Sequence, residues 1–356
     1  IITDDIDASG YESLTTFTGT LTAQTKTDGT FPVVKNLSVP LFTTATDAVI
    51  SNIILDNVGI SQDGKVGSIA CTANGTTSIY NCGILSGSVG STGTSSADNS
   101  TDCCGGLVGL LDGKARVINC YSYATITGGN RVGGIVGYNN YQTTSASDKL
   151  KTMVMNCMFY GDITGGQSIA PVYHGKKITN EGSTAVGNYN YFSADASYVK
   201  NNQIDYYYCA LMAETRFLQR FEFYRHLLNS HRELAAWWAT GDRANKDLMA
   251  KWVLEPSQIG SAQPYPILKA PNKQYPSVVN IDAKNATTQS ERNKGGKLGE
   301  LTVNIQMGSG GAQFAPPANA TITTSQLTLN ITDKDYDHFN FNYYKVQLPY
   351  YNEVGT

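Results

Sequence analysis

The feature that most constrains this chain is an internal repeat. Three similar blocks follow one another, and they start at Val66, Cys104 and Val132. Each block contains an Asn-Cys pair, and the pairs are Asn81-Cys82, Asn119-Cys120 and Asn156-Cys157. The pairs are 38 and 37 residues apart, which is typical of proteins in which each repeat is one structural unit. Weaker copies precede and follow them, with Asn52 and Asn190 in the asparagine position, so we expect four or five repeats.

Each repeat consists of three short apolar segments separated by glycine-rich corners. Apolar residues alternate within segments such as VINCYSYATI, which is typical of strands with one side in a core. A single repeat cannot bury that side alone, whereas stacked repeats share a core and pair their backbones. The sequence therefore predicts a mainly β chain with a right-handed parallel β-helix of four to five coils. Glycine supplies the positive φ angles of the corners, and the repeated glycines are Gly105, Gly106, Gly109, Gly133, Gly134 and Gly137.

The repeated polar residues have two interpretations. The aligned asparagines are Asn52, Asn81, Asn119 and Asn156. They could bind a ligand, but we favour amides that stack at a corner and hydrogen-bond one another and the backbone. We expect Cys82, Cys120 and Cys157 to stack as small apolar fillers. The chain has seven cysteines, so at least one thiol is unpaired, and a bridge from Cys71 to Cys82 or Cys103 stays open as an alternative.

Two repeated strings add a family resemblance. GGLVG at 105–109 and GGIVG at 133–137 are each followed by an Asn-Cys strand and an ITGG corner. These strings resemble the GLUG-motif repeats of adhesin-like surface proteins from gut Bacteroides-type bacteria, over about residues 10–200. The later YCALMAETRFLQRFEFYRHLLNSHRELAAWWATG and KVQLPYYNEVGT segments also resemble parts of such proteins. The resemblance implies a module of the cell surface that serves adhesion.

Residues 1–200 are therefore expected to form the β-helix, and residues 201–280 a helical cap with a Pro-rich connection. Apolar residues from Leu211 to Leu228 recur every three or four positions, which predicts a helix. Gly241 is expected to end the helical segment, and Asp242 to cap a second helix that carries Leu248, Met249 and Trp252. We expect this pair of helices to cover the open end of the β-helix. Residues 281–356 show period-two alternation, which predicts a small or incomplete β-sandwich.

Three groups of residues are candidates for chemistry. Asp333, Asp335 and Asp337 resemble the start of a calcium loop but lack the glycine and the closing glutamate, so a solvated acidic loop is the alternative. Trp237 and Trp238 form either a platform that stacks on a sugar or an anchor for the helix. His174, in YHGKK, is weighed as a catalytic residue, but no partner carboxylates occupy repeat-related positions. No cofactor other than this calcium ion is expected.

Composition removes several classes of function. Charged residues make up 15% of the chain and the formal net charge is −3, so no basic surface for nucleic acid is expected. No run of about 18 apolar residues occurs, and we expect no membrane span. The chain begins without Met, which we interpret as a segment of an exported precursor, located outside the cell or on its surface.

The sequence thus predicts a monomeric, non-catalytic surface module that binds a surface glycan or protein. A polysaccharide lyase or glycoside hydrolase is the first alternative, because parallel β-helices often carry such sites. A structural stalk that holds a distal domain away from the membrane is the second alternative.

Overall fold

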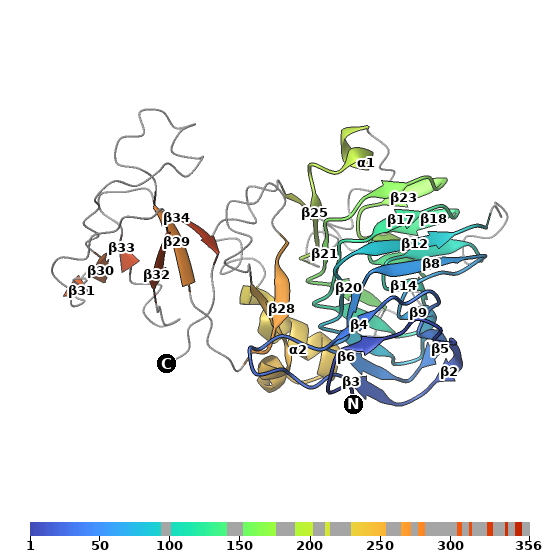
Figure 1. The fold of residues 1–356 in the computed structure, drawn as a ribbon, viewed down its shortest axis with the longest axis horizontal. Helices are drawn as coiled ribbons and strands as arrows, with labels where there is room; N and C mark the ends of the chain where they lie inside the picture. Colours follow the sequence, from blue (N-terminus) through green and yellow to red (C-terminus); the bar gives the residue numbers. More distant parts are fainter. Residues whose placement is uncertain are drawn as a thin grey trace, which may run out of the picture. The chain divides into compact units, whose positions relative to one another are not determined.

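A computed structural model describes residues 1–93, 101–140, 152–175, 189–201, 211–213, 229–253 and 265–271, and the backbone of six later strands between 277 and 350 (Figure 1). Contacts divide the chain into two units. The first unit contains Ile1–Glu214 and His231–Ala250, and the second contains Thr215–Ser230 and Lys251–Thr356.

The first unit is a parallel β-helix built from five sheets, which confirms the expected fold class. One sheet has six strands, β2 (Leu14–Phe17), β5 (Phe42–Thr46), β9 (Ala70–Asn74), β14 (Val108–Leu111), β19 (Val136–Asn139) and β24 (Tyr173–Gly175). The next has five strands, β3 (Thr20–Thr22), β6 (Val49–Ser51), β10 (Ser78–Tyr80), β15 (Arg116–Ile118) and β20 (Met153–Met155). Figure 1 shows successive strands lying side by side as rungs.

The other three sheets complete the coils. The eight-stranded sheet contains β1 (Ile6–Asp7), β4 (Val33–Lys35), β7 (Ile54–Asp56), β11 (Gly83–Ile84), β16 (Tyr121–Ser122), β21 (Met158–Phe159), β25 (Tyr191–Ser193) and β26 (Leu211–Ala213). The four-stranded sheet contains β8 (Val58–Gln62), β12 (Gly87–Ser91), β17 (Thr125–Thr127) and β22 (Ile163–Thr164). The three-stranded sheet contains β13 (Cys103–Gly105), β18 (Arg131–Gly133) and β23 (Ser168–Ala170).

Equivalent residues of successive repeats pair with one another. Ile79 is the parallel partner of both Ile50 and Val117, and Val117 also pairs with Val154. These inward side chains belong to one hydrophobic cluster that extends from Ala8 to Tyr198. The six-stranded sheet takes one strand from each of six coils, so the stack is longer than the four or five coils expected. The sequence underestimated the number because the first coils lack the Asn-Cys pair by which the repeats were recognised.

The helical residues of the first unit lie against the side of the β-helix. Helix α2 (Arg232–Thr240) contacts β10 and β15 of the five-stranded sheet, so the expectation that it covers the open end is wrong. Part of the outward face of this sheet is apolar, and Ile118 and Met155 pack with Ala235 and Ala236 of the helix. The short helix α1 (Ser197–Lys200) instead places Tyr198 in the core, 6.1 Å from the ring of Phe159.

The ends of the helical segment follow the sequence signals. Gly241 ends α2 in a left-handed conformation, and the Asp242 carboxylate accepts a hydrogen bond from the Ala244 amide at the start of η5 (Arg243–Leu248). The second helix is therefore a 3-10 helix that stops at Leu248, so it does not extend to Trp252. Leu211, expected in a helix, lies in strand β26, and 214–228 lies outside the described residues.

The described part of the second unit is antiparallel β structure. It has a hairpin-like pair, β27 (Lys251–Val253) with β28 (Ile267–Lys269). One three-stranded sheet contains β32 (Gln326–Leu329), β29 (Ser277–Ile281) and β34 (Val346–Tyr350). Another contains β31 (Gln313–Phe314), β30 (Ile305–Met307) and β33 (Phe339–Asn340). This β-rich composition agrees with the alternation in the sequence. None of the helices in the described ranges has the length and apolar character of a membrane span.

Candidate functional site

The repeated asparagines form a continuous row at one corner of the β-helix. Each follows a strand of the five-stranded sheet and has a left-handed backbone, with φ between 52° and 61°. The side-chain nitrogen of Asn156 donates to Asn119 Oδ1 at 2.8 Å, and that of Asn119 donates to Asn81 Oδ1 at 2.8 Å. Asn81 donates in turn to Asn52 Oδ1 at 2.9 Å. The row, defined as Asn52, Asn81, Asn119 and Asn156, therefore has a single direction of donation.

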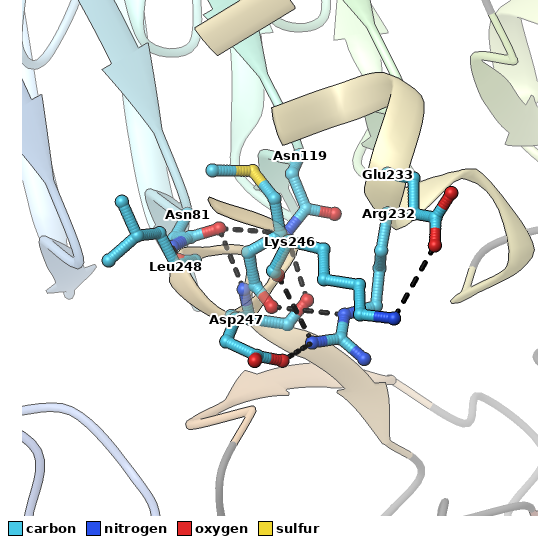
Figure 2. Close-up of polar contacts among 9 residues, drawn as sticks. Asn81, Asn119, Arg232, Glu233, Lys246, Asp247 and Leu248 are labelled. Atoms are coloured by element: carbon cyan, nitrogen blue, oxygen red, sulfur yellow. Dashed lines mark hydrogen bonds and ion pairs between the residues drawn. The ribbon is translucent and has the colours of Figure 1, made fainter. Parts of the chain in front are cut away.

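The middle of this asparagine row holds an extended segment of the same unit (Figure 2). Asn81 Nδ2 donates to the Leu248 carbonyl at 2.7 Å, and Asn81 Oδ1 accepts from the Ala250 amide at 3.0 Å. Asn119 Nδ2 donates to the Ala250 carbonyl at 3.0 Å. With its two neighbours in the row, Asn81 uses both of its protons and both acceptor positions of its oxygen. The row thus recognises backbone atoms, as a neighbouring strand would.

Arg232, at the start of α2, holds the same segment from its other side. Its Nε donates to the Met249 carbonyl at 3.1 Å, and Nη2 donates to the Lys246 carbonyl at 3.1 Å. Figure 2 also shows the contact of Arg232 with Asp247, whose carboxylate lies 3.6 Å from Nη2. Because the guanidinium is buried and binds carbonyl oxygens, it fixes the backbone after η5 in the position that the asparagine row requires.

The repeated cysteines lie directly inside the asparagine row. The thiols of Cys82, Cys120 and Cys157 donate to the carbonyl two residues earlier at 3.2–3.3 Å, and all three are buried free thiols. Burial raises the pKa of the Cys120 thiol well above its usual range, so this thiol stays protonated. Cys71 and Cys103 are also free, so the bridge left open from the sequence is absent from the described residues.

The repeated glycines are required by close backbone approach. A β-carbon on Gly106, Gly109 or Gly137 would lie 2.5–2.7 Å from backbone atoms of a neighbouring coil. On Gly134 it would lie 2.1 Å from the Phe159 ring. None of these six glycines has a positive φ, so their repetition has a steric reason. The glycines of the two ITGG corners, 128–129 and 165–166, do have positive φ angles, as expected for corners.

His174 has the surroundings of a buried structural residue. Its Nδ1 lies 2.9 Å from Nη1 of Arg131, and its Nε2 lies 2.9 Å from the Ser168 hydroxyl. Because a guanidinium only donates, Nδ1 must accept and the proton must sit on Nε2. A histidine in this tautomer cannot take the proton of Ser168. The pair therefore does not form the base and nucleophile of a hydrolase.

His174 is expected to make the folded protein less stable at acid pH. Burial, and secondarily the charge of Arg131, lowers the pKa of His174 to about 3. In the unfolded chain His174 takes up a proton near pH 6.5, whereas in the folded chain it does so only near pH 3. The free energy of unfolding therefore decreases as the pH drops below 6.5 and becomes constant below about pH 3. Between about pH 6 and pH 4.5, His174→Gln should reduce the slope of unfolding free energy by about 1 kcal/mol per pH unit. Urea unfolding at several pH values measures this, and equal slopes for both proteins contradict it.

The remaining candidate residues are separated. Trp237 is 44% exposed, whereas Trp238 packs against the outward face of the five-stranded sheet, with the Arg116 guanidinium 5.9 Å from its ring centre. The two rings do not form one platform. Asp333, Asp335 and Asp337 lie outside the described residues. Within the described ranges, no group of three His, Cys, Asp or Glu residues could hold a metal ion.

Several large apolar side chains of the first coil are exposed. Among the described residues, the large apolar side chains that remain exposed are Ile1, Ile6, Leu14, Trp237 and Leu248. Ile6 is 43% exposed and lies in β1, and Leu14 is 52% exposed and lies in β2. Both strands are the first of their sheets. Sequence reasoning missed this first-coil surface, defined as Ile1, Ile6 and Leu14, because isolated apolar residues carry no periodic signal.

Comparisons with known proteins give a family-model match to the first coils and one weak structural likeness. A family model described as the M26 IgA1-specific metallo-endopeptidase N-terminal region matches residues 5–85, less than a quarter of the chain. A search of curated proteins gives no match. A solved structure described as IgA1 protease resembles this chain with 20% identity and a TM-score of 0.35. That alignment covers 59% of this chain and 19% of the protease chain.

These matches correct the function expected from the sequence. The predictions of an adhesion module and of a chain without enzymatic activity are wrong, because the matched family model describes part of an endopeptidase. The physical reason for the error is that repeats and glycine spacing determine a scaffold, whereas a β-helix scaffold is compatible with many activities.

Proposed function

We propose that this chain is part of an extracellular metallo-endopeptidase, and that its first coils position a protein substrate. The observation that carries the proposal is the match of residues 5–85 to the N-terminal region of such an enzyme. These residues form the coils from β1 to β11. The family description names an antibody as the target, and antibodies are proteins of extracellular fluids. The partner is therefore a protein, and the location is outside the cell.

The first-coil surface supports a protein partner. Contiguous exposed apolar surface is typical of sites where another protein binds. Ile6 and Leu14 lie within the matched residues, and each is the register partner of a buried residue of the next coil, Val34 and Phe42. This geometry presents apolar contacts on a rigid support, so binding would cost little ordering of the backbone.

The family description also implies a metal ion. Among the described residues, both nitrogens of His174 are engaged by Arg131 and Ser168, and the repeated thiols donate to backbone carbonyls. These donors do not fit a catalytic metal. The function proposed for the described residues is therefore binding of the substrate, and no step of peptide cleavage is assigned to them. The likeness to GLUG-motif repeats and the monomeric state stay predictions.

Binding of immunoglobulin A1 to the 356-residue chain tests the proposal. We expect saturable binding by biolayer interferometry with a Kd of roughly 1–100 µM, and no binding of immunoglobulin G at the same concentration. The double variant Ile6→Ser, Leu14→Ser should weaken binding about tenfold or more, since each loses an apolar contact worth about 1 kcal/mol. Trp237→Ala, which removes an exposed apolar side chain from α2, is the matched control and should bind like the original chain.

Two outcomes contradict the proposal. One is the absence of saturable binding up to about 100 µM antibody, which is weaker than a functional encounter with substrate requires. The other is equal loss of affinity in the Ile6, Leu14 double variant and in Trp237→Ala, which would place the contact away from the first coil. Circular dichroism of each variant must first show the spectrum of the unchanged β-helix.

A further inference from the structure

Oxygen atoms from residues at the ends of β8 and β12 and just before β13 lie close together. Asp63 and Gly64 follow β8, Ser91 ends β12, and Asp102 precedes β13. Gln62 and Ser91 are register partners, so the ends of β8 and β12 lie side by side. The position that a β-carbon would take on Gly93 lies 2.8 Å from Asp102 Oδ1 and 2.8 Å from Asp63 Oδ1. The two carboxylates therefore approach the same point, within twice that distance of each other.

The Asp102 carboxylate is buried without compensation. The residue is 1% exposed, and its Oδ1 accepts from the Ser91 hydroxyl at 2.7 Å. Its Oδ2 is buried and has no hydrogen-bond partner among the described residues. A buried carboxylate with a free oxygen is costly, because water no longer solvates its charge. Neither Asp102 nor Asp63 takes part in an ion pair within the described ranges.

The Ser91 hydroxyl lies close to more acceptor oxygens than its single proton can bind. Its oxygen lies 2.7 Å from Asp102 Oδ1 and 3.1 Å from the Gly64 carbonyl, and both of these atoms are acceptors. It also accepts from the Gly93 amide at 3.2 Å. A hydroxyl has one proton, so it can donate to only one of the two acceptors at a time. One pair of oxygens therefore faces each other without a proton, an arrangement that a bound cation relieves.

We propose that Asp63, Gly64, Ser91 and Asp102 form a calcium site at this corner. All of the donors are hard oxygens from carboxylates, a backbone carbonyl and a hydroxyl, and Ca²⁺ prefers such donors at 2.3–2.6 Å in flexible geometry. The nearby thiol of Cys104 donates to the Val89 carbonyl, so it is not arranged as a ligand for zinc. The ion would join the ends of three strands from two neighbouring coils and neutralise the buried carboxylate.

Calcium titration of the whole chain tests this site. After dialysis against a chelator, CaCl2 should give saturable heat in calorimetry with a Kd of roughly 10 µM to 1 mM. At about one hundred times Kd, the melting temperature should rise by roughly 5 °C, whereas MgCl2 should give a much smaller rise. Asp102→Asn and Asp63→Asn should each weaken calcium binding about tenfold or more, because each replaces a charged ligand with a neutral one.

Two control variants separate this site from other acids. Asp112→Asn changes a turn carboxylate that binds the Gly113 amide and the Asn140 side chain, and it should keep the full calcium response. The triple variant Asp333→Asn, Asp335→Asn, Asp337→Asn removes the acidic cluster noted in the sequence and should also keep the response. Because Asp63 is exposed, Asp63→Asn should fold even where Asp102→Asn does not.

Three results would contradict the proposed calcium site. The first is the absence of both heat and a melting shift up to about 10 mM CaCl2, beyond the range of extracellular calcium modules. The second is a calcium response in Asp63→Asn equal to that of the unchanged chain. The third is loss of the response in the triple variant at 333, 335 and 337 with retention in Asp63→Asn, which would place the ion in the later acidic cluster.

Discussion

Replacing Gly105 or Gly133 with alanine should destabilise the β-helix by about 4 kcal/mol or more, so that the variants are recovered only as unfolded protein at 37 °C. A β-carbon on Gly105 would lie 2.2 Å from the Val108 carbonyl oxygen and 2.3 Å from the Gly137 amide nitrogen. On Gly133 it would lie 2.1 Å from the Val136 carbonyl oxygen. These atoms are backbone, so no side chain can rotate away. The backbone three residues after each glycine would have to move, and for Gly105 the neighbouring coil that contains Gly137 would have to move as well.

Gly59→Ala is the matched control for this prediction. Gly59 also lies in a strand of the β-helix, but nothing lies within 4 Å of its β-carbon position. Its replacement should change the unfolding free energy by less than about 1 kcal/mol, and in the stabilising direction if the unfolded chain loses freedom. Urea unfolding followed by circular dichroism measures both effects. A Gly105→Ala protein within about 1 kcal/mol of the original chain would show that the coils can separate at little cost.

Asn119→Ala should cost about 3–5 kcal/mol of unfolding free energy. The variant loses the bonds from Asn119 to Asn81 and to the Ala250 carbonyl, and it loses the acceptor for Asn156. Buried polar groups that lose a partner cost about 1–3 kcal/mol each. Alanine also tolerates the left-handed backbone at φ 54° less well than asparagine, which adds about 1 kcal/mol. Urea unfolding provides the measurement.

Two controls separate the causes of that loss. Asn119→Gly removes the side chain but accepts the left-handed backbone, so it should recover about 1 kcal/mol relative to alanine. Asn57→Ala changes an exposed asparagine with φ 51° and should cost only about 1 kcal/mol. Hydrogen exchange at Ala250 should accelerate in Asn119→Ala, because the amide is held by Asn81, whose oxygen loses the neighbour that orients it. Unchanged exchange at Ala250 would mean that the segment is held independently of the row.

The sequence predicted those parts of the structure in which the same residues are needed at the same position of every coil. The Asn-Cys pair recurs because each corner needs a left-handed residue followed by a small buried one, so its period revealed the β-helix and aligned Asn81 with Asn119. The docking of residues 248–250 depends on single contacts, from Asn81 to Leu248 and from Asn119 to Ala250, and no period encodes them. One signal was present, since Ile118 and Met155 are apolar although they face outward.

Two other features of the site could be placed only once the register of the paired strands was known. Arg131 and Ser168 are direct register partners in adjacent coils, and Tyr138 pairs with His174, so the cluster around the histidine follows once the strands are aligned. Part of the oxygen-rich corner at Asp102 follows from the same alignment, because Gln62 and Ser91 are register partners, which places Asp63 and Gly64 beside the end of β12. Function could not be predicted in this way, because the exposed residues Ile6 and Leu14 carry no repeated pattern and the scaffold does not select an activity.

The one-way donation along the asparagine row makes the β-helix extensible. Every coil with an asparagine at this corner brings one acceptor for the coil after it and one donor for the coil before it, so duplication of a whole coil leaves no amide stranded in the interior. Gene duplication can therefore lengthen the β-helix in steps of about 37 residues, because each added coil brings the side-chain amide that its two neighbours need for hydrogen bonding. A partial duplication would break the chain of amides, which makes the complete coil the smallest unit of evolutionary change in this part of the protein.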